Sequence, residues 1–153
     1  MSVSVRAIVI KDNKLLVMDR NKFGDHYLSL VGGTVEDGEE LVEALKREVS
    51  EETTLEITNP RLVIDEEAGA AGKQYYIYLC DYVSGEPKLN PDSIEAKIQA
   101  EGKNLFVPKW LDIAKLEASD LLPIELKDLL VGLIRDGFPD QPIKLRIDGS
   151  SKL

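Results

Sequence analysis

The chain has 153 residues, of which 28 are acidic and 19 are basic, so its formal net charge is −9. This length suits one compact core and is short for two. The negative charge disfavours long nucleic acids as partners, because their non-specific binding depends on Lys and Arg neutralising phosphates. No run approaches the eighteen or so apolar residues of a membrane span, and no basic, apolar leader precedes the first predicted strand, so we expect a soluble protein.

The N-terminal part of the chain is predicted to form strands. Residues 3–10 and 14–18 are rich in β-forming residues and flank a turn at 11–13, a pattern typical of a hairpin. A short strand follows at 31–35 and contains the pair Gly32 and Gly33, where missing side chains would let a ligand approach the backbone. A helix is expected next, with Asp37 as its cap and Glu39 near the positive end of its dipole.

The predicted helix carries an unusual arrangement of glutamates. Glu48, Glu51 and Glu52 are spaced so that they lie on one edge of the helix. Glu52 falls within the apolar stripe, which is formed by Leu41, Val42, Leu45 and Val49. The alternative is a solvated surface helix rich in Glu and Lys. A carboxylate within the apolar stripe argues against that alternative and indicates a site.

The side chains that could act as ligands indicate which metal the site would bind. Crowded carboxylates repel one another and need a cation, and oxygen ligands suit Mg²⁺ or Mn²⁺. Zinc would favour thiolate and imidazole ligands, but the chain has one cysteine, Cys80, and one histidine, His26. A single cysteine also permits no internal disulfide, which fits a reducing compartment such as the cytoplasm.

The remaining elements predict an α/β fold. Strands are expected at residues 56–65, 74–83 and 104–110, with 74–83 as a central strand, and an amphipathic helix at 123–135. The order predicts a sandwich with helices on both faces of a mixed β-sheet. We expect a single domain over residues 1–137. Residues 138–153 contain two prolines and no clear period, which predicts a loosely packed C-terminal tail.

Residues 33–55 resemble the Nudix box, GX5EX7REUXEEXGU with U aliphatic, which is the signature of Nudix hydrolases. The matching positions are Gly33, Glu39, Arg47, Glu48, Val49, Glu51, Glu52 and Leu55. Thr54 replaces the family glycine, and Val31 stands where many relatives have proline. A left-handed residue at the helix end would cost threonine about 1–2 kcal/mol, so we expect the helix to run on or the turn to be rebuilt.

The resemblance implies a Nudix-type α/β/α sandwich that hydrolyses a pyrophosphate bond by water attack at phosphorus. The implied substrate is a nucleoside diphosphate linked to another moiety, such as a dNTP, an NDP-sugar or a dinucleotide. Glu48, Glu51 and Glu52 would bind Mg²⁺ or Mn²⁺ with the backbone carbonyl of Gly33, and Glu48 is the first candidate to activate water. Arg47 is expected to hold the carboxylates, and Glu39 to support the site.

Further candidates lie outside the box. Relatives often use a downstream acid, and Glu95 and Glu101 are in the right region, with Glu86 as a weaker choice. Each of these acids would otherwise be ordinary surface charge. The resemblance also indicates three substrate contacts, for which the candidates are Arg20, Tyr27 and Arg6.

A second function is left open, namely a catalytically inactive Nudix-like module that binds nucleotides or regulates. The chain keeps all three carboxylates of the REXXEE segment, which favours the enzyme. We expect a small-molecule nucleotide as partner, no long nucleic acid, no membrane, and a homodimer as the candidate assembly. The expected location is cytoplasmic, although Ser151, Lys152 and Leu153 would form a peroxisomal address in a eukaryote.

Overall fold

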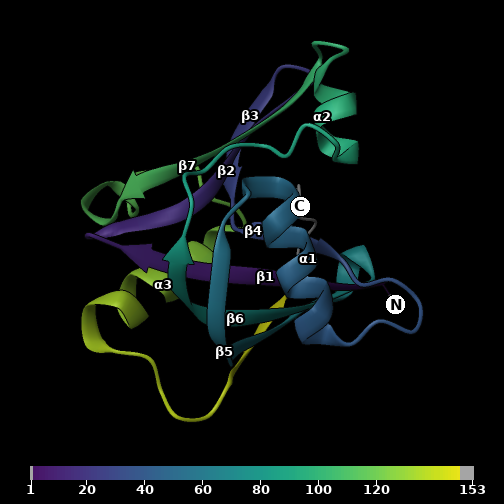
Figure 1. Ribbon diagram of the computed structural model, residues 1–153. Coiled ribbons are helices and arrows are strands. Elements are labelled where there is room, and N and C mark those ends of the chain that lie inside the picture. Colours follow the sequence, from purple (N-terminus) through teal and green to yellow (C-terminus); the bar gives the residue numbers. More distant parts are fainter. Residues whose placement is uncertain (1, 149–153) are drawn as a thin grey trace.

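The computed structural model describes residues 2–148, which form an α/β sandwich around a mixed sheet (Figure 1). Two short 3-10 turns, Gly69–Ala71 and Ile113–Lys115, complete the regular structure of the described residues. The strands are β1 Ser2–Lys11, β2 Lys14–Lys22, β3 Asp25–Ser29, β4 Val31–Thr34, β5 Glu56–Ala68, β6 Lys73–Ser84, β7 Asn104–Asp112 and β8 Ile143–Ile147, and the helices are α1 Leu41–Thr53, α2 Ile94–Gln99 and α3 Ile124–Asp136.

The sheet is mixed because β1 has neighbours of both directions. β1 runs parallel to β6 and antiparallel to β4, while β5 is antiparallel to β6 and parallel to β8. β2 meets β1 only near the turn, at Ile10 opposite Leu15 and Lys11 opposite Lys14. The rest of β2 pairs with β3 and β7, so these three strands extend away from the main sheet and carry α2 at their far end (Figure 1).

Alternation along the central strands gives the sheet two apolar faces, each covered by one long helix. On one face the core includes Val5, Ala7 and Val9 of β1 with Ala44, Leu45 and Val49 of α1. On the other it includes Ile8, Ile64 and Ile77 with Leu126, Leu130 and Leu133 of α3. The predicted sandwich is confirmed. Within residues 2–148, no helix has the length and apolar character needed to cross a membrane.

Most predicted elements are present, with different ends. The hairpin of β1 and β2, the central strand β6, and the elements β7 and α3 are confirmed. The strand expected at 56–65 continues to Ala68. β3 and α2 were not predicted; α2 has only six residues, too few for a clear amphipathic period.

The segment expected to be a loosely packed tail instead contributes a strand. β8 pairs with β5 in parallel from Ile64 opposite Ile143 to Ala68 opposite Ile147, and Ile147 is buried. A five-residue strand at a sheet edge has too short a pattern to stand out beside two prolines. The candidate peroxisomal address, Ser151 to Leu153, lies outside the described residues.

Candidate functional site

The start of α1 differs from the prediction. The helix begins at Leu41 after Glu40, so Asp37 is not its cap and lies in the preceding turn. The backbone N–H of Glu40 donates to Glu43 Oε1 at 3.2 Å, which satisfies one of the donors that a helix start leaves open. Glu39 lies directly before this cap, at the N-terminal end of the helix.

The end of α1 also corrects an expectation. Thr54 itself adopts the left-handed conformation, with φ of 63°, and its N–H donates to the Ser50 carbonyl. The helix therefore does not extend past Thr53, and the turn that ends it is not rebuilt. The hydroxyl of Thr54 donates to the Glu86 carbonyl at 3.1 Å, a contact between distant segments that offsets part of the conformational cost.

The glycine pair brings β4 against α1 at the glutamates. The N–H of Gly32 donates to Glu52 Oε1 at 3.0 Å. A Cβ on Gly33 would overlap the Glu48 carboxylate, so only glycine leaves room for that side chain. The backbone of β4 and the acidic edge of α1 thus form two walls of one site.

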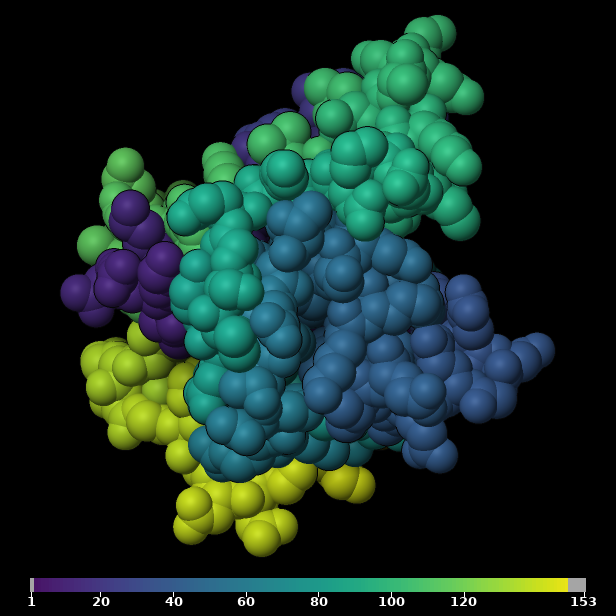
Figure 2. All heavy atoms as spheres, viewed as in Figure 1, coloured from purple at the N-terminus to yellow at the C-terminus, as the bar shows by residue number. Residues whose placement is uncertain are grey.

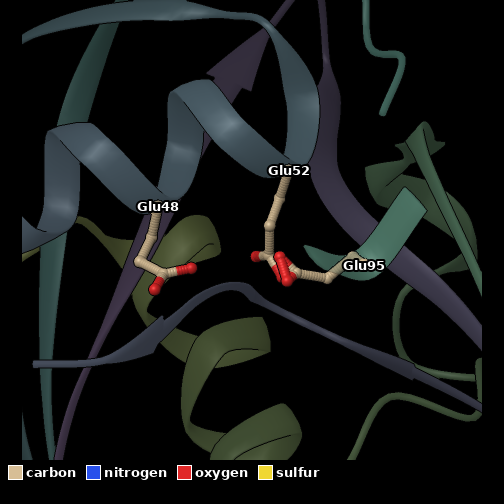
Figure 3. A group of neighbouring side chains, drawn as sticks. All are labelled: Glu48, Glu52 and Glu95. Carbon is tan, nitrogen blue, oxygen red and sulfur yellow. The ribbon is translucent and has the colours of Figure 1, made fainter. Parts of the chain in front are cut away.

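Three carboxylates converge at this place. Glu48 and Glu52 point to the same side of α1, and Glu95 approaches Glu52 from α2 (Figure 3). One oxygen from each of the three lies within 4.8 Å of the others. α2 is fixed at its start by Ser93, whose Oγ accepts from the Ala96 N–H. The sequence suggested either Glu95 or Glu101 as the downstream acid, and the structure brings Glu95 to the cluster.

Burial makes this cluster electrostatically unfavourable by itself. Desolvation raises the pKa of Glu48, and it raises the pKa of Glu52 to about 8. Desolvation also raises the pKa of Glu95. The charge of Glu95 raises the pKa of Glu48 and of Glu52, and the charge of Glu48 raises the pKa of Glu52 further. A bound divalent cation would offset this repulsion. Oxygen donors in this number, with room for water, fit Mg²⁺ or Mn²⁺.

Arg47 forms ion pairs with three acidic side chains at the site. Its guanidinium contacts Glu39 Oε2 at 2.8 Å, Glu48 Oε1 at 2.9 Å and Glu51 Oε2 at 3.3 Å. A fourth contact reaches the Thr34 carbonyl at 3.2 Å. The hydrogen bonds from Arg47 lower the pKa of Glu39 to about 2. Glu51 is turned toward Arg47 and lies outside the three-carboxylate cluster, although it lines the same groove.

The cluster lies in an open groove of about 590 Å³. Its walls are the glycine pair, α1, the segment before α2, and Phe106 of β7. That segment is anchored to α1, since the N–H groups of Lys88 and Asn90 donate to the Thr53 and Glu51 carbonyls. The space-filling view shows this segment and α2, in teal and green, directly against α1, in blue (Figure 2).

Two of the three predicted substrate residues lie beside the cluster. Arg6 and Arg20 line a smaller hollow of about 70 Å³ that also includes Glu52 and Phe106. The Arg20 guanidinium carbon lies 3.8 Å from the centre of the Phe106 ring. The same guanidinium donates hydrogen bonds to Asn104 Oδ1 and to the Leu105 carbonyl. Tyr27 is buried, and its ring centre lies 5.8 Å from the Arg20 guanidinium carbon.

Other acids proposed from sequence are not brought to the cluster. Glu101 is exposed in the turn after α2, and Glu86 is exposed and contacts Thr54 through its backbone carbonyl. Sequence reasoning missed Phe106, Asn90 and Ser93, which line the groove. Phe106 has the pattern of an ordinary strand residue, and the other two lie in an irregular segment without a motif.

The family follows from the sequence as a whole. The family model of the NUDIX domain matches residues 1–129. The chain therefore belongs to the NUDIX domain family, as the box indicated.

Part of the chain is also similar in sequence to the NudC proteins of two Vibrio species. It is 32% identical over 87 residues to the NAD-capped RNA hydrolase NudC of Vibrio parahaemolyticus, covering 57% of this chain and 33% of that protein. The NudC of Vibrio atlanticus is 28% identical over 116 residues, covering 76% of this chain and 38% of that protein. This chain thus spans little more than a third of those relatives.

Two of the solved structures that share the fold match nearly the whole chain. A NUDIX hydrolase from Nitrosomonas europaea superposes with a TM-score of 0.75 at 18% identity, covering 97% of this chain and 79% of that one. An ADP-ribose pyrophosphatase from Streptococcus suis has a TM-score of 0.66 at 19% identity, covering 96% of this chain and 98% of that one. At these identities the likeness concerns the fold.

Proposed function

We propose that the protein hydrolyses a pyrophosphate bond in a small nucleotide, with Mg²⁺ or Mn²⁺, by attack of water at phosphorus. The observation that carries this proposal is the cluster of Glu48, Glu52 and Glu95 against the glycine pair. Buried carboxylates in one groove need a cation, and a protein with net charge −9 can accept a pyrophosphate there only with metal ions.

The chain's residues have distinct proposed roles. Glu48, Glu52 and Glu95 would hold the metal, with the Gly33 carbonyl and Glu51 as further ligands. When bound, the ion supplies charge neutralisation to the pyrophosphate oxygens. Glu48 remains the first candidate to orient or deprotonate the attacking water. Arg47 is a positioning residue, because its guanidinium fixes the Glu48 and Glu51 carboxylates.

The proposed substrate class is a nucleoside diphosphate joined to another group. The names of the relatives and structures support it, since ADP-ribose and an NAD cap both contain a pyrophosphate that joins a nucleoside to a second moiety. We favour a small nucleotide over a capped RNA, because the acidic chain offers little attraction to an RNA body. A homodimer and a cytoplasmic location stay predictions.

A panel of substrates tests the proposal. dNTPs, NDP-sugars and dinucleotides are incubated with Mg²⁺ or Mn²⁺, and the products are identified by mass spectrometry. Glu52→Gln and Glu95→Gln should each lower turnover by at least about a hundredfold, because a charged ligand is lost. Glu101→Gln, which removes an exposed charge beyond α2, should retain turnover.

Two outcomes would contradict the proposal. Wild-type protein that binds members of the panel and cleaves none would favour the alternative, an inactive nucleotide-binding or regulatory module. Near-normal turnover by folded Glu52→Gln would mean that the three-carboxylate cluster is not the catalytic site, whichever substrate is cleaved.

A further inference from the structure

Among residues 2–148, two buried polar atoms in the sheet have no hydrogen-bond partner. They are Glu66 Oε1 on β5 and the Tyr75 hydroxyl on β6. The two residues lie directly opposite in the antiparallel register and are 3% and 4% exposed. Most buried polar groups in proteins are paired, so two adjacent orphans indicate a missing partner.

Both residues line one end of a series of hollows. The first hollow, about 10 Å³, is formed by Glu66, Tyr75, Arg6 and Leu30 together with Ile77, Leu122, Pro123 and Leu126. It has room for at most one water. The hollow of about 70 Å³ beside Glu52 is also lined by Arg6 and Leu30. The groove of about 590 Å³ shares Gly32, Glu52 and Phe106 with that second hollow.

Arg6 lines both the hollow beside Glu52 and the hollow that contains the two orphans. Its guanidinium carbon lies 5.0 Å from the centre of the Tyr75 ring, and its side chain donates to the Val5 carbonyl at 3.1 Å. The positive charge of Arg6 acts on both sides, because it lowers the pKa of Glu52 and of Glu66 against the larger effect of desolvation. Arg6 and Leu30 are the residues that line both of the smaller hollows.

The chemistry of the orphans defines what would satisfy them. An ionised carboxylate only accepts hydrogen bonds, and a tyrosine hydroxyl can accept or donate. Two donors on neighbouring atoms would match Glu66, and Tyr75 could bind beside them. In a nucleotide, such a pair is found at the N1 and N2 positions of guanine and at the 2′ and 3′ hydroxyls of ribose.

We propose that Glu66 and Tyr75 form a specificity subsite that reads adjacent hydrogen-bond donors on the nucleoside part of the substrate, reached past Arg6. The inference rests on the proposed function, because the pyrophosphate in the groove would bring that part of the substrate to Arg6. The subsite discriminates between nucleotides, and the bond is cleaved elsewhere. A single buried water shared by the two orphans is the competing occupant.

Binding of nucleoside monophosphates tests the subsite without any turnover. Wild-type protein in EDTA at pH 8 is titrated with GMP, IMP and 2′-deoxy-GMP, and dissociation constants are taken from amide chemical shifts in NMR spectra. IMP lacks the N2 donor of guanine, and 2′-deoxy-GMP lacks one ribose donor. The wild type should bind GMP about tenfold more tightly than at least one of the other two.

The variants assign that preference to the subsite. Glu66→Gln, which has the same shape, should reduce the preference to within about twofold, and Tyr75→Phe should weaken GMP binding. Glu67→Gln is the matched control, because it removes the neighbouring charge on β5 from a partly exposed side chain that does not line the first hollow. It should keep the wild-type preference.

Each other result has a definite meaning. Equal preferences in wild type and Glu66→Gln, or no binding of any monophosphate by wild type, would overturn the subsite and leave the buried water as the occupant. A Glu66-dependent preference without Mg²⁺-dependent cleavage of any pyrophosphate would instead keep the nucleoside subsite and defeat the proposed function. The two failures are thereby distinguishable.

Discussion

At the scale of single residues, the same side chain acquires very different acidity in different places. Arg47 holds the pKa of Glu39 at about 2, while desolvation raises the pKa of Glu52 to about 8 and that of Glu66 to about 7. The sequence presents all three simply as glutamates in acidic stretches. Their environments are created by an arginine on α1, the glycine pair and a buried sheet face, which only the fold combines.

Glu66 should make stability depend on pH. Its pKa is raised by desolvation from the ordinary value of 4.5 to about 7, so the folded state binds a proton more tightly than the unfolded state. Its favourable contribution is complete below pH 4.5 and is lost as pH rises to about 7. Glu66→Gln should therefore gain stability relative to wild type between pH 5 and pH 8, by up to about 3 kcal/mol.

Urea denaturation of both proteins at the two pH values measures this difference. Glu67→Gln, whose side chain is partly exposed, should show no comparable change. A stability difference between Glu66→Gln and wild type that stays constant from pH 5 to pH 8 would contradict the assigned environment of Glu66.

At the scale of elements, the site depends on how closely β4 approaches α1. The REXXEE spacing sets two glutamates on one edge of the helix, but the backbone opposite them must be free of side chains. Gly33 faces the Glu48 carboxylate, whereas Gly32 faces the Val5 carbonyl on β1. Although the two glycines are adjacent in sequence, Gly33 makes room for a side chain of the site and Gly32 makes room for the backbone of the neighbouring strand.

Substitution of each glycine should separate these roles. In Gly33→Ala the new Cβ meets the flexible end of Glu48, so Mg²⁺-dependent turnover should fall by at least about tenfold with little loss of stability. In Gly32→Ala the Cβ meets the backbone of β1, so the protein should be destabilised. Turnover assays and thermal melts measure both effects. Full activity in Gly33→Ala would contradict the close packing of Glu48.

At the scale of the whole molecule, the sheet joins segments from both ends of the described chain. β1 lies in its interior beside β6, and β8 closes the edge of β5. The pairing of β5 with β8 also covers the strand that carries Glu66, since Glu66 is opposite Leu145. Residues 143–147 are therefore part of the structure that supports the proposed subsite.

The contribution of β8 can be measured with one substitution. Ile147→Ala removes a side chain that is 2% exposed, so the free energy of unfolding should fall by about 2–5 kcal/mol. Lys144→Ala, at an exposed position of the same strand, should change it by less than about 0.5 kcal/mol. Equal, small effects of both substitutions in chemical denaturation would restore the picture of a loosely packed tail.

The sequence by itself determined the local features of this protein. Runs of β-forming residues predicted β1, β2, β6 and β7. The box indicated the family, the acidic edge of α1 and the glycine pair, because these signals lie within a few helical turns or one strand. Even so, the end of α1 depended on a distant contact between Thr54 and Glu86.

Only the tertiary structure decided which distant residues meet. Glu95 rather than Glu101 reaches the cluster because the segment before α2 is anchored to α1. Ile147 is buried because β8 pairs with the edge of β5. Glu66 is buried because α3 and the residues just before it cover that face of the sheet. Such contacts depend on the packing of the whole sheet, and no short stretch of sequence carries a period or a spacing that reveals them.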